Sequence, residues 1–140
     1  MEEIEKELQI IQEELIKKLE PLAIILFGSY TRNTQNDESD IDIAYKGKKI
    51  SKIELFEFKQ KLENLVNRDI DLIDLDEIGD DFRYEILMNG TTLYCKDSYK
   101  FDMYKIDMFR EYLELNESRQ SIINNIKNGG TIYGKWNCYY

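Results

Sequence analysis

Two aspartates, Asp40 and Asp42, stand two positions apart in a stretch that alternates polar and apolar residues. Alternate residues of a β-strand point to the same face, about 6.6 Å apart along the strand. Both carboxylates would therefore project together, while Ile41 and Ile43 point to the core. Carboxylates placed in this way repel each other unless a cation lies between them. Mg²⁺ suits the geometry, because it takes carboxylate oxygens, keeps waters and bridges to phosphates.

Gly28 and Ser29 directly follow a continuous apolar run at residues 22–27. Glycine has no Cβ, so backbone N–H groups at this position can approach a polyphosphate closely. Ser29 adds a hydroxyl donor, and a helical turn beginning there would offer further N–H groups to an anion. One segment would then hold phosphates, and another the metal that neutralises them.

A third carboxylate comes from residues 69–74, where Ile70 and Leu72 share one face of a predicted strand. Asp69 and Asp71 share the other face. If this strand neighbours the one that carries Asp40, Asp71 completes a cluster of three carboxylates, with Asp69 and Asp74 as nearby alternatives. In metal-assisted nucleotidyl transfer, such a group either binds a second metal or takes the proton of the attacking hydroxyl.

The composition limits the other chemistry. The chain of 140 residues contains no histidine, which excludes a Ser-His-Asp triad and any His-ligated metal site within it. Its net charge of −9 argues against direct binding of nucleic acid, and its apolar runs are too short to span a membrane. Two isolated cysteines, Cys95 and Cys138, and an N-terminus unlike a signal peptide favour the cytoplasm.

Periodicity predicts the elements that must position these groups. We expect helices at 2–19, 53–66, 82–88 and 98–127, and strands at 22–27, 40–44, 70–75 and 91–95. This order predicts the α/β (α+β) class, with a small mixed β-sheet flanked by helices and a long C-terminal helix. We divide the chain into a core at 1–96, a C-terminal helix packed on it at 97–128 and an aromatic tail at 129–140.

The sequence also predicts one buried stripe and two surface features. The helix at 53–66 would bury an apolar stripe, formed by Leu55, Phe56, Leu62 and Leu65 or Val66. A group of basic residues is expected to form an exposed turn: Lys46, Lys48, Lys49 and Lys52. The tail is aromatic and nearly uncharged, so it either docks on a partner or folds back on the body.

The motif Gly28-Ser29, ten residues and then Asp40-x-Asp42, followed by Ile70-Asp71-Leu72, resembles the DNA polymerase β-like nucleotidyltransferases. Within them, the chain is most similar to the minimal nucleotidyltransferase (MNT) branch. The likeness covers roughly residues 22–94 and is closest at 27–32 and 39–43. Asn33 departs from the pattern, since the family usually has glycine after the arginine.

This resemblance implies a polymerase β-like core and Mg²⁺-dependent transfer of a nucleoside monophosphate from an NTP to a hydroxyl, with release of pyrophosphate. Small members resemble the antitoxins of HEPN/MNT pairs, in which the antitoxin adenylylates a tyrosine of a HEPN RNase toxin and silences it. ATP and the HEPN toxin would then be the partners.

By position, the resemblance makes Asp40, Asp42 and Asp71 the metal ligands, and these three together with Ser29 the catalytic residues. Gly28 and Ser29 would grip the phosphates, and Arg32 would contact the nucleotide. Two other functions stay open. One is a non-catalytic antitoxin that covers its partner sterically, and the other is a nucleotidyltransferase for small molecules such as antibiotics.

Overall fold

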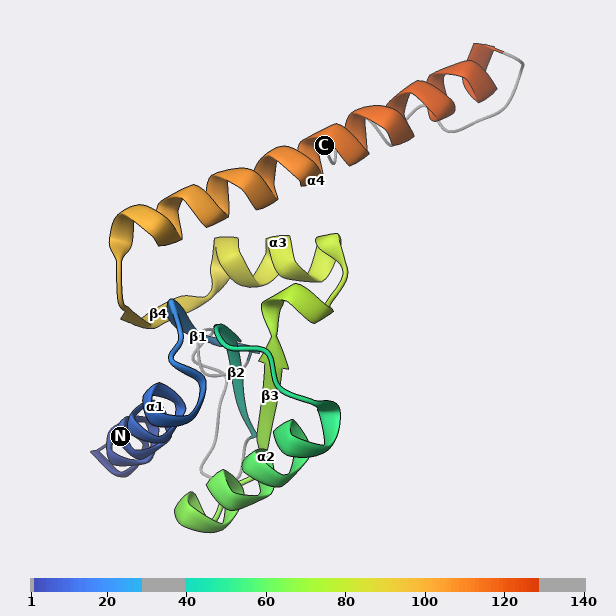
Figure 1. Cartoon of the computed structure of the whole chain (residues 1–140). Helices are drawn as coiled ribbons and strands as arrows, with labels where there is room; N and C mark the ends of the chain where they lie inside the picture. Colours follow the sequence, from blue (N-terminus) through green and yellow to red (C-terminus); the bar gives the residue numbers. More distant parts are fainter. Residues whose placement is uncertain (1, 29–39, 129–140) are drawn as a thin grey trace.

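The computed structural model describes residues 2–28 and 40–128 of the chain (Figure 1). The elements are α1 (Glu2–Leu19), β1 (Ala23–Phe27), β2 (Ile41–Lys46), α2 (Lys52–Val66), β3 (Ile70–Asp74), the 3₁₀ helix η2 (Leu75–Glu77), α3 (Asp80–Asn89), β4 (Thr91–Cys95) and α4 (Ser98–Asn128). The predicted order of helices and strands and the predicted fold class are confirmed; η2 is the one described element that the periodicity did not predict. No helix in the described ranges is long and apolar enough to cross a membrane.

The four strands form one mixed sheet in the order β3-β2-β1-β4. β1 pairs antiparallel with both of its neighbours, whereas β2 and β3 are parallel. Parallel neighbours need a crossover between them, and α2 supplies it. The apolar run of β1 is explained by its place inside the sheet, where both faces are covered.

Helices cover both faces of the sheet, so the fold has three layers (Figure 1). On one face, Ile24 and Ile43 pack with residues of α1 and α2, such as Leu15 and Leu62. Their neighbours in sequence point to the opposite face, where Ile25 packs with residues of α3 and of the beginning of α4. α4 then continues past the sheet as a long, single helix (Figure 1).

The buried stripe of α2 differs from the prediction. Phe58, Leu62 and Val66 are buried, and they recur every four residues. Phe56, which was assigned to the stripe, is 55% exposed, and Leu65 is 49% exposed. Residues two positions apart on a helix point in directions about 200° apart around its axis. A helix that buries Phe58 therefore turns Phe56 to solvent.

Of the lysines predicted to form an exposed turn, Lys49 is exposed but takes part in ion pairs, whereas Lys46 ends β2 and is partly buried. Lys46 Nζ lies 2.5 Å from Asp76 Oδ2, and Lys49 Nζ lies 3.1 Å from Asp74 Oδ2. The Tyr104 hydroxyl of α4 donates to Asp76 across 3.1 Å. Burial opposes ionisation of Asp76, but the contact with Lys46 outweighs it and lowers the pKa of this carboxyl. These lysines therefore tie β2 and the following turn to η2.

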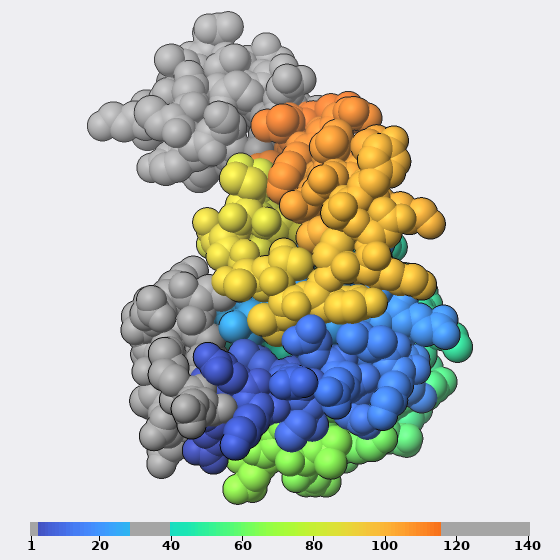
Figure 2. Space-filling view, turned by 90° about the vertical axis from the view of Figure 1, so that its left-hand side faces the viewer, coloured from blue at the N-terminus to red at the C-terminus, as the bar shows by residue number. Residues whose placement is uncertain are grey.

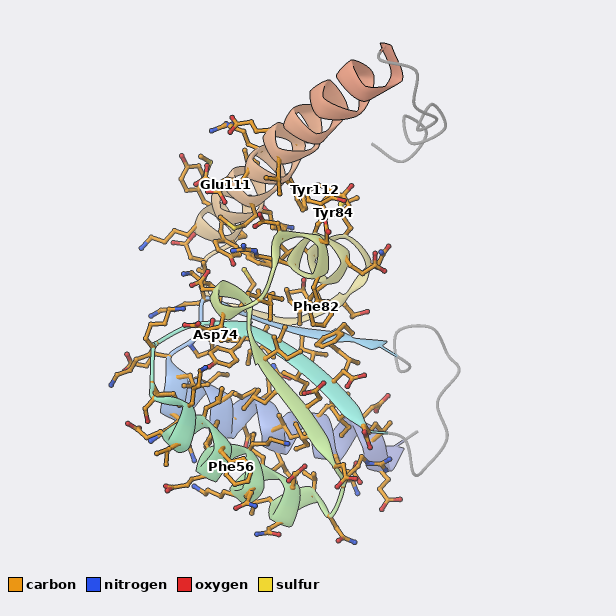
Figure 3. The ribbon with its side chains drawn as sticks, turned by 90° about the vertical axis from the view of Figure 1, so that its right-hand side faces the viewer. Phe56, Asp74, Phe82, Tyr84, Glu111 and Tyr112 are labelled. Atoms are coloured by element: carbon orange, nitrogen blue, oxygen red, sulfur yellow. The ribbon has the colours of Figure 1, made fainter. Side chains whose placement is uncertain are left out.

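Aromatic contacts set the direction of α4 on α3. The rings of Tyr84 and Tyr112 are stacked, with centroids 4.2 Å apart and planes inclined by 14° (Figure 3). Phe109 meets Tyr84 edge to face at 5.5 Å. Such pairs each add about 0.5–1.5 kcal/mol beyond the area they bury. Two rings of α4, three positions apart, therefore pack on Tyr84 of α3.

One ion pair connects the N-terminal helix to the turn before β3. Arg68 Nε donates to Glu7 Oε2 across 2.6 Å, and both side chains are only 11% exposed. Removal of one partner from a pair this well buried leaves a charge without its counter-ion, which is more costly than loss of an exposed pair.

We expect Arg68→Met to lower the free energy of unfolding by about 3 kcal/mol, measured by urea denaturation at neutral pH. The matched control is Lys17→Met, because Lys17 is 76% exposed and lies 3.7 Å from Glu14. This control should change the value by less than about 0.5 kcal/mol. Equal effects of the two substitutions would contradict a special role for the buried pair.

Candidate active site

Three side chains form a row across the sheet, one on each of β1, β2 and β3. Phe27 is the partner of Asp42 in the antiparallel pair, and Asp42 is the partner of Asp71 in the parallel pair. Cross-strand partners point to the same face of a sheet, with backbones about 4.8 Å apart. The strand order thus brings Asp42 and Asp71 together, as the sequence predicted on the condition that their strands are neighbours.

Asp40 lies one residue before β2 and is exposed. The chain is already tied to the β3 side here, because the Ile41 backbone N–H donates to the Asp69 carbonyl across 3.0 Å. Asp74, one of the alternatives to Asp71, is buried at the other end of β3 and pairs with Lys49. The structure therefore favours Asp71 over Asp74 as the companion of Asp42.

Gly28 packs directly against the carboxylate of Asp42. Its φ of +79° lies in the left-handed region, which strains residues that carry a side chain. A Cβ at this position would overlap Oδ2 of Asp42. Both observations require glycine, so the residue that the sequence assigned to phosphate approach also leaves room for the acidic side chain.

Within the described ranges, the three carboxylates of the site have no basic partner. Burial raises the pKa of Asp42, and the charges of Asp71 and Asp40 raise it further. Among the residues that the structure describes, no lysine or arginine forms an ion pair with any of these three carboxylates. Other described carboxylates, such as Asp76, have cationic partners. The electrostatics of this corner therefore favour a cation from solution.

Aromatic rings form the apolar wall of the site. Phe82 lies in the first turn of α3 (Figure 3). It meets Phe27 edge to face, with ring centroids 5.8 Å apart. Phe82 is 42% exposed and thus extends beyond the core. Phe82 was not predicted as part of the site, because no local spacing in the sequence relates it to Phe27, 55 positions earlier. Because Phe27 is the cross-strand partner of Asp42, this aromatic pair borders the acidic row.

The carboxylates at this corner of the sheet are suited to binding a divalent cation together with a substrate. In the described ranges, no three acidic, cysteine or histidine side chains already converge as a metal site. The carboxylates are neighbours on one corner of the sheet rather than a closed group. Mg²⁺ is usually held by one or two carboxylates together with waters and substrate phosphates. Asp42 and Asp71 supply only oxygen, and no lysine or arginine of residues 2–28 and 40–128 pairs with them, so they fit that requirement.

Two residues of the predicted site, Ser29 and Arg32, lie outside the described residues, as does the loop that contains them. Phe27, two residues before this segment begins, lies beside Asp42 in the sheet register. The chain therefore enters residues 29–39 from the acidic corner and leaves them at Asp40, on the same corner. The aromatic tail also lies outside the described residues.

Comparisons with known proteins agree with this geometry. Residues 9–99, more than half of the chain, match the family model for polymerase beta nucleotidyltransferases. Protein adenylyltransferase MntA of Shewanella oneidensis is 32% identical over 74% of this chain and 74% of its own length.

The fold is likewise similar to solved structures of antitoxins. A toxin–antitoxin crystal structure with AMP-PNP superposes with a TM-score of 0.72 at 29% identity, covering 86% of this chain and 98% of the other. A second match is in a structure of a tri-AMPylated HEPN toxin of Shewanella oneidensis in complex with an MNT antitoxin. Its TM-score is 0.66 at 27% identity, and the match covers 89% of this chain and 98% of the other. The predicted relationship is confirmed. The chain belongs to the polymerase beta nucleotidyltransferase family, in the group that includes protein adenylyltransferase MntA.

Proposed function

We propose that this protein is an antitoxin that transfers AMP from ATP to a tyrosine hydroxyl of a HEPN RNase toxin and so neutralises it. The observation that carries the proposal is the pairing of Asp42 with Asp71, with Gly28 packed against Asp42. A partly buried carboxylate beside a second carboxylate costs stability, and nucleotidyl transfer gives the pair a use. The similarity to complexes of an MNT antitoxin with a HEPN toxin and with an ATP analogue supports this substrate and partner.

In the proposed reaction, the tyrosine oxygen attacks the α-phosphorus of ATP. The new ester bond forms as the bond to the β-phosphate oxygen breaks, and pyrophosphate leaves. Asp71 takes the phenolic proton, because it stands at the open edge of the acidic corner and is exposed. Gly28 and Ser29 hold the phosphates, and Arg32 contacts them from the same segment.

Asp40 and Asp42 would hold Mg²⁺, with Asp71 as a further ligand. When bound, the metal neutralises the charge of the triphosphate and polarises the phosphorus–oxygen bond. Phe82 contacts Phe27 and is 42% exposed, so its ring is available to contact the bound nucleotide. The proposed location is the cytoplasm, where the RNase substrate of such a toxin is found.

The function is tested by incubation of the protein with labelled ATP, Mg²⁺ and the HEPN toxin of its pair. The wild type should label the toxin and remove its RNase activity. Asp42→Asn should reduce labelling by at least about 100-fold, because it removes a metal ligand and keeps the shape of the side chain. Labelling by the variant at the wild-type rate would contradict the proposed site.

The same variant has a second readout. The folded-state pKa of Asp42 is raised, which means that folding favours its protonated form. The contribution of Asp42 to the free energy of unfolding is therefore complete below its unfolded pKa and is lost as the pH rises through its folded pKa. Asp42→Asn should therefore unfold at the same or a higher urea concentration than the wild type at pH 7 without divalent cations. A large loss of stability would mean that lost activity reports misfolding.

Other outcomes of the labelling experiment identify the other two functions. Neutralisation without labelling, retained in the variant with Asp40→Ala and Asp42→Ala, identifies a steric antitoxin. Labelling of an aminoglycoside when no protein acceptor is present identifies a small-molecule nucleotidyltransferase.

Asp71→Asn should lower the rate of labelling by at least about 100-fold, since Asp71 is the in-register neighbour of Asp42. The matched control is Asp69→Asn, two residues earlier and equally exposed, which should stay within about threefold of the wild type. A larger effect at Asp69 than at Asp71 would show that the carboxylate was assigned to the wrong residue.

Gly28→Ala should lower the free energy of unfolding by about 1–2 kcal/mol because of its positive φ. It should also weaken binding of ATP, measured by calorimetry with Mg²⁺, because the added Cβ displaces the Asp42 carboxylate. Gly79→Ala is the control, since a Cβ there meets nothing within 4 Å. Unchanged ATP affinity in Gly28→Ala would argue against the role given to this contact.

A further inference from the structure

α4 presents a second apolar face to solvent. Four residues form what we name the outer stripe, with exposed fractions of 72%, 40%, 46% and 54%: Tyr99, Met103, Ile106 and Leu113. Their spacing is 4, 3 and 7 residues, which is one side of a helix. Arg110 stands in the gap of seven, at the position that continues the stripe, and pairs with Asp107.

The inner face of the same helix is already used. Phe101 is buried, and Tyr104 and Tyr112 contact η2 and α3. At 100° per residue, these positions lie opposite the outer stripe. α4 is thus apolar on two opposite sides, and over residues 98–115 the structure covers one of them. A helix that is apolar on both sides is typical of one packed between two partners.

The outer stripe also borders a hollow in the surface. Ile106, Phe109, Arg110, Leu113 and Glu114 line a hollow of about 500 Å³. Figure 2 shows residues up to 115 of α4 as the outermost layer above α3 and the sheet. Apolar side chains that extend from a hollow along a rigid helix provide the shape that an amphipathic helix of another protein can fill.

We propose that the outer stripe is the docking surface for an apolar face of a helix of the HEPN toxin, an inference that rests on the proposed function. A spacing of alternating four and three residues is the one that packs against another helix. A net charge of −9 opposes pairing with a second copy and favours a basic partner. The match to toxin–antitoxin complexes covers 86% of the chain, so it extends into α4, which begins at Ser98.

The test is the double variant Ile106→Glu and Leu113→Glu, which keeps good helix formers and introduces charge into the stripe. Affinity for the HEPN toxin is measured by calorimetry with Asp42→Asn present in every protein, so that no turnover occurs. The double variant should bind at least tenfold more weakly. The matched control is Ile53→Glu on α2, where Ile53 is 72% exposed; its affinity should equal that of the parent.

Circular dichroism and urea denaturation show whether the double variant is folded, and its affinity for ATP should be unchanged. With Asp42 restored, its KM for the toxin should rise while kcat is kept. Toxin affinity equal to that of the parent would overturn the docking surface, even if the toxin is labelled normally. Conversely, a wild type that binds through the stripe and transfers no AMP would overturn the proposed function and leave the docking surface standing.

Light scattering distinguishes two other occupants. A dimer of the wild type that the double variant dissociates would assign the stripe to a second copy of the chain and overturn the proposal. Truncation after residue 128 tests the aromatic tail. If truncation strengthens toxin binding through the outer stripe, the tail competes for this surface. If truncation abolishes toxin binding while the double variant binds the toxin as the parent does, the docking surface is the tail and the proposal is overturned.

Discussion

The strand register that places Asp42 beside Asp71 is the constraint on which the site depends. Parallel pairing of β2 with β3 places the two carboxylates at the same level of the sheet. Burial raises the pKa of Asp42, and the charges of Asp71 and Asp40 raise it further. A register shifted by one residue would turn one of them into the core, because alternate residues face opposite sides. The crossover through α2 and the buried residues of both strands therefore have to fix this register.

The acidic side chains of β2 and β3 have different partners at the two ends of these strands. At the end where they leave the sheet, Lys46 and Lys49 compensate Asp76 and Asp74. At the end where they enter it, the described part of the chain offers the aspartates no cation. Stabilisation is thus supplied away from the acidic corner, by the apolar layers on both faces and by the pair of Arg68 with Glu7. Local instability at the corner is what makes it receptive to a cation and a nucleotide.

Local pattern predicted the helices and strands well, because each follows a periodicity and some end at a glycine or proline, as α1 does before Pro21 and α3 before Gly90. The pairing of Asp42 with Asp71 could be stated from sequence only on a condition, since strand order is a long-range property. For the same reason, Phe56 was placed in the core instead of Phe58, and the contact of Phe82 with Phe27 was missed. Apolar residues two apart on a helix look equivalent in composition, and only the packing partner selects one of them.

α3 connects the two surfaces that the chain offers to other molecules. Phe82 and Tyr84 are two residues apart on this short helix, so they point to different sides, about 200° apart. Phe82 contacts Phe27 in the acidic row, whereas Tyr84 stacks on Tyr112 of α4 (Figure 3). A partner held on α4 is therefore fixed relative to Asp42 through one rigid element. Since transfer to a hydroxyl requires the acceptor to be held near the phosphate, this connection allows a surface remote from the chemistry to set the position of the reacting group.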